Sequence, residues 1–393
     1  MQLNELCCWG SKMLARIRCD FSDVADRFIG YIPRKVRETA SVYDVAYAGG
    51  QWLEAYLKAG GTVSNITGRE DNACYSSYAK DGILYGAKLI DASIDDALNR
   101  QTQKYGLVLG FPNLGGSTAS GNKDWKKAFR LQLLSAASGA WGISILPLSW
   151  RTQKTTYRLV TSIQIYKIES TVIAGKHVDV LVWQNFPYSK PTNVDGILIP
   201  LNERPLLPEA ISDSTLSIVE KFFNRTIDRM KVQNTQTHHR IRNYVSYKKK
   251  KGTYTFPLRD ASKLWWARKE HPWQNIWKIL LPRFGYANPT FDRGVLGTTG
   301  DCNAILLENV EKRKNLGAKI MRLLEHPIYK YCLAMHGIKM KGGPQIGNGL
   351  NDYKVLCELL PMANIRSNFS YESLYQYFGY TQKEQAEIES MCV

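Results

Sequence analysis

Residues 105–116 read Tyr105-Gly-Leu-Val-Leu-Gly-Phe-Pro-Asn-Leu-Gly-Gly116 and join a strand to a loop. Leu107, Val108 and Leu109 make a short apolar run, which is typical of a buried central strand. The glycines, proline and asparagine that follow are turn formers, so we expect the chain to leave the sheet at once. In open α/β sheets, ligands bind outside the carboxyl ends of the strands. The sequence therefore predicts a ligand-binding loop directly after Gly110.

The residues before this loop predict the rest of a parallel sheet. Strand signals at 40–45, 62–67 and 88–92 alternate with helix signals at 21–33, 51–58 and 73–85, and residues 1–20 also favour a helix. Such alternation is typical of a parallel sheet with right-handed crossovers. After the loop we expect a helix over 125–138 that residues 139–142 end, a short strand over 143–146, and a helix over 157–163. The last expected strands are 164–171 and 178–183.

Length and composition indicate a folded protein of two domains. The chain has 393 residues, of which 44% are hydrophobic and 11% aromatic, which excludes a disordered chain. Residues 190–208 are rich in Pro and Asn, and we interpret them as a linker. We therefore expect a first domain over 1–192 and a second over 193–393.

The charge of the chain favours a polyanionic partner. Its formal net charge is +17, which points first to nucleic acid and second to an anionic membrane surface. Residues 231–283 hold 13 Lys and Arg against two acidic residues. Basic residues interleaved with aromatic ones suit phosphate contacts and stacking on bases. The candidate nucleic-acid contacts are Lys248, Lys249, Lys250, Lys251, Arg259, Trp265 and Arg268.

A solvated charge run on a β-hairpin that turns at Gly252 is the alternative interpretation of the four lysines. His238 and His239 stand next to Arg240, where they could touch phosphate, although we expect such loop histidines to be exposed and inert. The eight cysteines show no zinc-ligand spacing, and no secretion signal or membrane span is visible, so we expect reduced thiols, no metal and a cytoplasmic location.

The order of these motifs resembles the adenine-N6 DNA methyltransferases of restriction-modification type, whose cofactor region precedes a target-recognition domain. Asp44-Val-Ala-Tyr-Ala-Gly-Gly-Gln-Trp-Leu53 is similar to their cofactor loop, Asp-Pro-Ala-Cys-Gly-Ser-Gly-Gly-Phe-Leu. Residues 107–114 are similar to their catalytic loop, Leu-Val-Leu-Gly-Asn-Pro-Pro-Phe. Residues 145–150 and 377–384 resemble two further motifs of the family. The resemblance implies a mostly parallel methyltransferase-type α/β sheet flanked by helices, followed by an α+β target-recognition domain.

The resemblance also implies S-adenosylmethionine as cofactor and duplex DNA as partner, bound in the cleft between the domains. Glu70 falls where the family's acidic residue meets the ribose, and Asp91 where an acidic group meets the adenine. Trp150 falls near the pocket for the flipped base, although a tryptophan after a strand is more often part of the core. The cofactor residues that the resemblance indicates are Phe21, Asp44, Ala46, Gly50, Glu70 and Asp91.

The catalytic loop departs from the family pattern. The family binds the adenine amine through an Asn or Asp oxygen and a proline carbonyl, and an aromatic ring stacks on the flipped base. Here Phe111 stands in the amide's place, Leu114 stands in the ring's place, and Asn113 comes two positions late after Pro112. Ala48 also replaces a glycine in the cofactor loop.

We consider three possible functions. The first is a catalytically degenerate DNA-binding protein that acts as a recognition subunit beside an active methyltransferase homologue. The second is an active DNA adenine-N6 methyltransferase with divergent motifs, in which Asn113 or another group accepts the amine. The third is an RNA-binding protein or RNA methyltransferase with the same fold.

Overall fold

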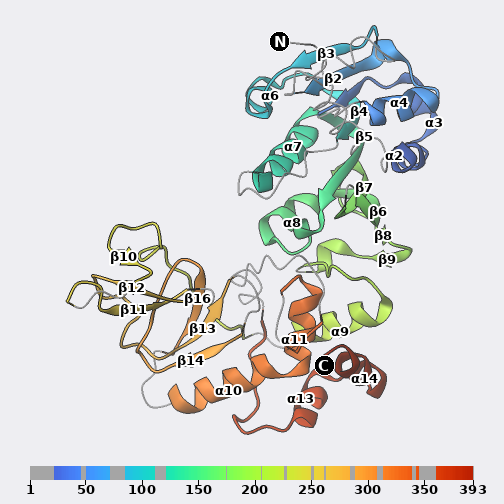
Figure 1. Cartoon of the computed structure of the whole chain (residues 1–393). Coiled ribbons are helices and arrows are strands. Elements are labelled where there is room, and N and C mark those ends of the chain that lie inside the picture. The colour runs from blue at the N-terminus through green and yellow to red at the C-terminus, as the bar shows by residue number, and fades with distance from the viewer. Residues whose placement is uncertain are drawn as a thin grey trace. The chain divides into compact units, whose positions relative to one another are not determined.

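The computed structural model describes residues 22–45, 50–70, 85–110, 121–173, 175–204, 206–224, 228–248, 252–260, 263–283, 288–307, 313–338, 342–344 and 360–392 (Figure 1). The chain divides into two compact units. The first comprises residues 1–150 and 155–205, and the second comprises residues 151–154 and 206–393. Among the described helices, none is long and apolar enough to cross a membrane.

A nine-stranded sheet forms the centre of the first unit, in the order β3-β2-β1-β4-β5-β7-β6-β8-β9. Strands β3 to β5 pair in parallel, and β7 runs antiparallel between β5 and β6. This mostly parallel sheet with flanking helices confirms the methyltransferase-type α/β class. The strands are β1 (Val42–Asp44), β2 (Ile66–Glu70), β3 (Lys88–Asp91), β4 (Tyr105–Gly110), β5 (Ala136–Pro147), β6 (Ile163–Ile173), β7 (Lys176–Pro187), β8 (Thr192–Val194) and β9 (Ile197–Ile199).

The central position predicted for residues 107–109 is confirmed. β4 lies between β1 and β5, and Leu107, Val108 and Leu109 are fully buried. Helix α2 turns its apolar face to the same core, as its spacing predicts, and packs against α4. The described helices of this unit are α2 (Ser22–Ile29), α3 (Arg34–Thr39), α4 (Gln51–Lys58), α6 (Ile94–Arg100), α7 (Gly121–Ser135) and α8 (Lys154–Val160).

The helix expected over 125–138 ends earlier, and the strand expected over 143–146 is much longer. Helix α7 stops at Ser135, and β5 begins at Ala136. The glycine expected to break the helix, Gly139, lies inside β5 with φ +75°. The register of β5 against β4 shifts between Tyr105 and Leu107. An irregularity of this kind accommodates a left-handed residue within a strand, which is why a glycine occurs there.

Three further predictions in this unit were wrong in detail. The second strand starts at Ile66, because a 3-10 turn occupies Val63–Asn65. The helix expected over 157–163 spans Lys154–Val160. The expected linker over 190–208 instead adds the antiparallel hairpin β8–β9 to the sheet. Asp195 (φ 49°) and Gly196 (φ 96°) form its turn. A two-residue Asp-Gly loop is a strong hairpin signal, because both residues can adopt positive φ.

The second unit contains two small sheets and a group of helices, an α+β arrangement. One sheet has the order β10-β12-β11-β15 and the other β14-β13-β16. The strands are β10 (Val245–Ser246), β11 (Phe256–Arg259), β12 (Leu264–Ala267), β13 (Lys278–Pro282), β14 (Thr290–Asp292), β15 (Gly297–Thr298) and β16 (Cys302–Leu306). The described helices are α9 (Asp213–Asn224), α10 (Arg313–Glu325), α11 (Pro327–Met335), α13 (Tyr371–Phe378) and α14 (Gln382–Met391).

Among the residues that the structure describes, β10 and β11 do not form the alternative hairpin around Gly252. Gly252 does turn, with φ +75°, but β10 and β11 do not pair with each other. Both pair antiparallel with β12, which lies between them.

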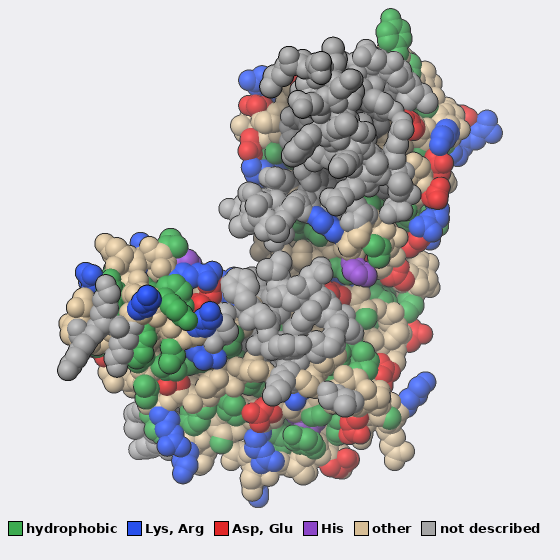
Figure 2. All heavy atoms as spheres, viewed as in Figure 1, with side chains coloured by type: hydrophobic (Ala, Val, Ile, Leu, Met, Phe, Trp, Pro, Cys, Tyr) green, Lys and Arg blue, Asp and Glu red, His purple; other side chains and the backbone are tan. Residues whose placement is uncertain are grey.

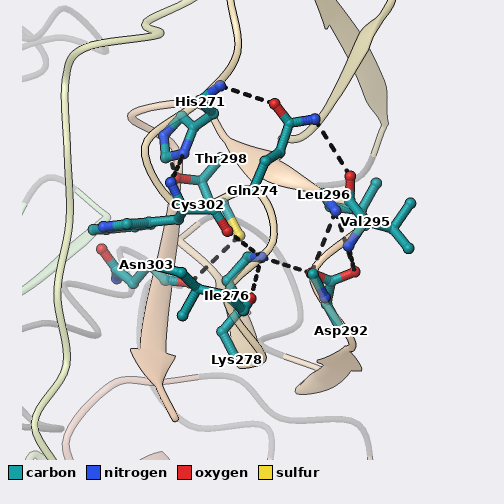
Figure 3. A network of polar contacts seen from close by, with 12 residues as sticks. His271, Gln274, Ile276, Lys278, Asp292, Val295, Leu296, Thr298, Cys302 and Asn303 are labelled. Atoms are coloured by element: carbon teal, nitrogen blue, oxygen red, sulfur yellow. Dashed lines mark hydrogen bonds and ion pairs between the residues drawn. The ribbon is translucent and has the colours of Figure 1, made fainter. Parts of the chain in front are cut away.

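A buried ion pair joins the strands of the three-stranded sheet (Figure 3). The side chain of Lys278 is fully buried, and its Nζ donates to Asp292 Oδ2 at 2.6 Å and to the carbonyls of Trp273 and Ile276 at 2.8 and 2.9 Å. The Asp292 carboxylate also accepts the backbone N–H groups of residues 294–296. Burial lowers the pKa of Lys278, which Asp292 partly offsets. Because Lys278 Nζ has three acceptors, all three donors of its ammonium group are satisfied.

We predict that Lys278→Met destabilises the second unit by about 3–5 kcal/mol, because it leaves a buried carboxylate without its counter-charge. The double variant Lys278→Met, Asp292→Leu should cost less than the sum of the two single changes. Hydrogen exchange of peptides from β13 and β16 in increasing urea measures the stability of this unit alone.

The matched control is Lys314→Met, which removes an exposed lysine of the same unit and should change stability by less than about 0.5 kcal/mol. Equal effects at positions 278 and 314 would contradict the assigned role of the buried pair.

Candidate functional site

The strand order of the first unit reverses between β1 and β4. From β1 the chain adds β2 and β3 on one side and β4 on the other. Asp44 lies in register with Gly68 of β2 and Leu109 of β4, and Val45 N donates to Leu109 O at 3.0 Å. Ligands of open α/β sheets bind outside the carboxyl ends of the strands at such a switch point. The ends of β1 and β4 are therefore the candidate small-molecule site.

Two of the residues expected to bind the cofactor occupy this switch point. Asp44 ends β1 and is fully buried. Gly50 precedes the first residue of α4 with φ +90°, a conformation that favours glycine. Arg69 of β2 is also buried, and its Nη1 donates to Val45 O at 3.1 Å. The end of β1 is thus tied to both neighbouring strands.

The acidic ends of β2 and β3 lie side by side. Glu70 and Asp91 are register partners, and the Asp91 side chain is exposed to solvent. Two other expected cofactor residues, Phe21 and Ala46, lie outside the described residues. The expected catalytic residues Phe111, Pro112, Asn113 and Leu114 also lie outside them.

Close packing fixes the end of β4, where the predicted ligand loop begins. A Cβ atom at Gly110 would lie 2.6 Å from Gln132 Nε2 and 2.7 Å from Val45 Cγ2. Gln132 cannot move easily, because its Nε2 donates to Ile143 O at 3.0 Å and its Oε1 accepts from Ser144 Oγ at 2.8 Å. From the sequence alone, Gly110 is expected only as a turn former. The structure shows that it is also needed for close packing.

Trp150 is a core residue, which corrects its expected place near a flipped base. Its side chain is fully buried. The indole Nε1 donates to Asp179 Oδ2 at 2.6 Å, and the ring stacks on Tyr157 with centroids 5.7 Å apart. A ring packed in this way offers no face to a nucleotide.

Basic and hydrophobic side chains gather around β10, β11 and β12 of the second unit (Figure 2). Lys263 Nζ lies 5.4 Å from the ring centroid of Tyr247, Arg268 Cζ lies 4.6 Å from that of Tyr254, and Lys269 Nζ lies 5.3 Å from that of Tyr244. Cations held over aromatic rings are positioned while they remain charged. We call Tyr244, Tyr247, Lys248, Tyr254, Lys263, Arg268 and Lys269 the basic sheet surface.

The residues predicted to contact nucleic acid differ in their exposure to solvent. Lys248 and Arg268 are exposed on the basic sheet surface, whereas Lys249, Lys250 and Lys251 lie outside the described residues. Trp265 is half-buried against the small core of Val245, Leu258 and Ala267. Arg259 is half-buried as well. Lys263 and Lys269 were not singled out from the sequence, because only their contacts with the rings of Tyr247 and Tyr244 separate them from other charges.

His238 is not the exposed loop residue that the sequence predicts. It is 3% exposed, and its ring lies 4.8 Å from that of His271. Its Nε2 donates to Lys269 O at 3.1 Å. Burial lowers the pKa of His238 and lowers that of His271 to about 3, so both rings are neutral packing groups. Among the described residues, no group of three or more His, Cys, Asp or Glu side chains could hold a metal ion.

No family model and no curated protein sequence matches this chain. Part of it is similar to a Listeria monocytogenes protein assigned to the class I S-adenosylmethionine-dependent methyltransferases, with TM-score 0.35 and 11% identity, over 44% of this chain and 63% of that one. It is also similar to magnesium protoporphyrin IX methyltransferase of Synechocystis with bound S-adenosylmethionine. The TM-score is 0.34 and the identity 13%, over 44% of this chain and 83% of that one. A third similar structure is the M protein of the type I restriction enzyme EcoKI, with TM-score 0.33 and 12% identity, over 41% of this chain and 43% of that one. Each likeness involves less than half of this chain.

We predict that Gly110→Ala lowers the free energy of unfolding by about 1–3 kcal/mol, because its methyl group would overlap Val45 and a hydrogen-bonded Gln132. Thermal unfolding of the variant measures the loss. In a Val45→Ala background, which removes one of the two obstructing groups, the same change should cost less. An identical cost in both backgrounds would mean that contact with Val45 does not explain the effect.

Proposed function

We propose that this chain binds duplex DNA through its second unit, on a methyltransferase-type fold that has lost catalysis. The basic sheet surface carries the proposal. Its three lysines and its arginine are exposed, and three of these four cations lie over tyrosine rings. Such cations neutralise phosphates and release counterions, while the exposed ring of Tyr247 offers a contact to sugars and bases.

The loss of catalysis rests on the loop that follows Gly110. The chain enters it at the switch point, where a reacting base would be met. In the family that the sequence resembles, this loop supplies an amide oxygen and a stacking ring. Phe111 has no side-chain acceptor, and Leu114 has no ring. A chain that binds DNA without methylating it would serve as the recognition subunit of a complex, with an active homologue as its partner.

We predict that replacing Lys248, Lys263 and Arg268 together by alanine weakens binding to a mixed-sequence DNA duplex. It should also reduce the slope of log K against log salt by about 3, because each lost phosphate contact contributes about 0.9. Fluorescence anisotropy at salt concentrations from about 50 to 200 mM measures both the affinity and the slope.

The matched control replaces Lys314, Arg366 and Lys383, three exposed cations of the same unit outside the basic sheet surface. It removes the same charge and should leave the slope nearly unchanged. Equal slopes for the two triple variants would reject the surface. Tighter binding of a structured RNA than of the duplex at the same salt would favour the RNA-binding alternative.

The switch point favours a second candidate function, an active S-adenosylmethionine-dependent adenine-N6 methyltransferase. Two described residues support this candidate. Gly50 has the left-handed conformation that such a loop needs before α4, and Asp91 presents an exposed carboxylate at the end of β3. Asp91 would meet the adenine, and Glu70 the ribose. When bound, the cofactor would supply the methyl group.

Titration calorimetry with S-adenosylmethionine distinguishes the two functions. If the fold is degenerate, we expect a dissociation constant above about 1 mM, that is, a binding free energy weaker than about −4 kcal/mol. Micromolar binding would contradict the loss of the cofactor site. Transfer of a labelled methyl group to adenine in duplex DNA would establish the enzyme.

A further inference from the structure

A loop with an exposed aliphatic tip lies next to the basic sheet surface. Ile241 is 81% exposed, and Arg240 and Arg242, its neighbours in the sequence, are exposed as well. Single exposed aliphatic residues are common and need no explanation. Here, however, the aliphatic side chain stands between two arginines on a structured loop, which is a more specific arrangement.

Hydrogen bonds hold this loop in one shape. His239 N donates to Gln236 O at 3.2 Å, Arg242 N donates to His239 O at 2.9 Å, and Ile241 N donates to His239 Nδ1 at 3.3 Å. The buried ring of His238 lies at the base of the loop. The tip is therefore presented in a fixed position, without the loss of conformational entropy that a flexible loop would suffer on binding.

Two further contacts connect the loop to its surroundings. Arg240 Nη2 lies 3.0 Å from Asp301 Oδ2, beside β16. The hydroxyl of Tyr244 donates to Thr237 O within the loop, while the ring of Tyr244 holds Lys269. Tyr244 thus links the loop to the basic sheet surface.

We propose that Ile241 is an apolar wedge that enters the minor groove of DNA and inserts at a base step. This inference rests on the proposed DNA binding. A loop tip is narrower than the helix or two-stranded ribbon that fits the major groove. Arginines commonly enter the minor groove, where an inserted aliphatic side chain unstacks the bases and bends the duplex. Arg242 would hold a flanking phosphate while Ile241 separates the bases, and Arg240 would brace the loop through its ion pair with Asp301.

The test uses the full chain on a relaxed circular plasmid, which needs no knowledge of a target site. The bound plasmid is closed again by topoisomerase I and freed of protein, and its linking number is compared with that of the naked plasmid. A parallel gel shift of the same plasmid reports binding. We expect the unaltered chain to reduce the linking number in proportion to the amount bound, because inserted side chains unwind DNA.

Ile241→Ala should abolish this change while binding stays within about tenfold, because the basic residues that dominate affinity remain. Ile241→Met keeps a long apolar side chain and should preserve the change. The matched control is Val295→Ala, which shortens another aliphatic side chain of the second unit that is 64% exposed, and it should behave as the unaltered chain.

Two results would overturn the wedge and leave DNA binding intact. In one, the unaltered chain binds the plasmid without changing its linking number. In the other, Ile241→Ala changes the linking number as much as the unaltered chain does. Failure of the unaltered chain to shift the plasmid at low salt would instead reject the proposed function, and the wedge with it.

Discussion

The first unit depends on the parallel pairing of β1 with β4. This pairing sets Asp44 beside Leu109, and the bond from Val45 N to Leu109 O continues it past the end of β1. Both chain segments that could meet a ligand start from this point, one toward α4 and the other after Gly110. The pairing tolerates little variation, because Gly110 leaves no room for a side chain between Val45 and Gln132. The points at which the chain leaves the sheet, Val45 and Gly110, are therefore set by the packing beneath them.

The cations of the second unit are of two kinds, those paired with carboxylates and those exposed to solvent. Lys278 is buried and neutralised by Asp292, and Arg240 meets Asp301. Lys248, Lys263 and Arg268 are exposed around a small sheet. Only cations of the second kind contribute a field that an incoming polyanion can feel. A count of charges along the sequence includes both kinds, so it overstates the charge available to a partner.

Local pattern explains which parts of the fold could be predicted from the sequence. The apolar run of β4 and the helical spacing in α2 and α4 are strong signals, and both were interpreted correctly. Gly139 looks like a helix breaker because nothing local shows that two strands pair with its neighbours. The Asp195–Gly196 turn was readable from the sequence, but the surrounding prolines suggested a linker. The position of β12 between β10 and β11, and the burial of His238 and Trp150, depend on contacts between distant residues, which periodicity does not encode.

The buried pair of Lys278 and Asp292 has a consequence for how this protein can diverge. Replacement of either residue alone leaves an uncompensated charge in the interior, whereas replacement of both by apolar residues can be nearly neutral. A lineage can lose the pair only by crossing an unstable intermediate, so the two positions should change together or not at all. Descendants of this chain should therefore keep the second unit's three-stranded sheet recognisable for as long as neither position changes alone.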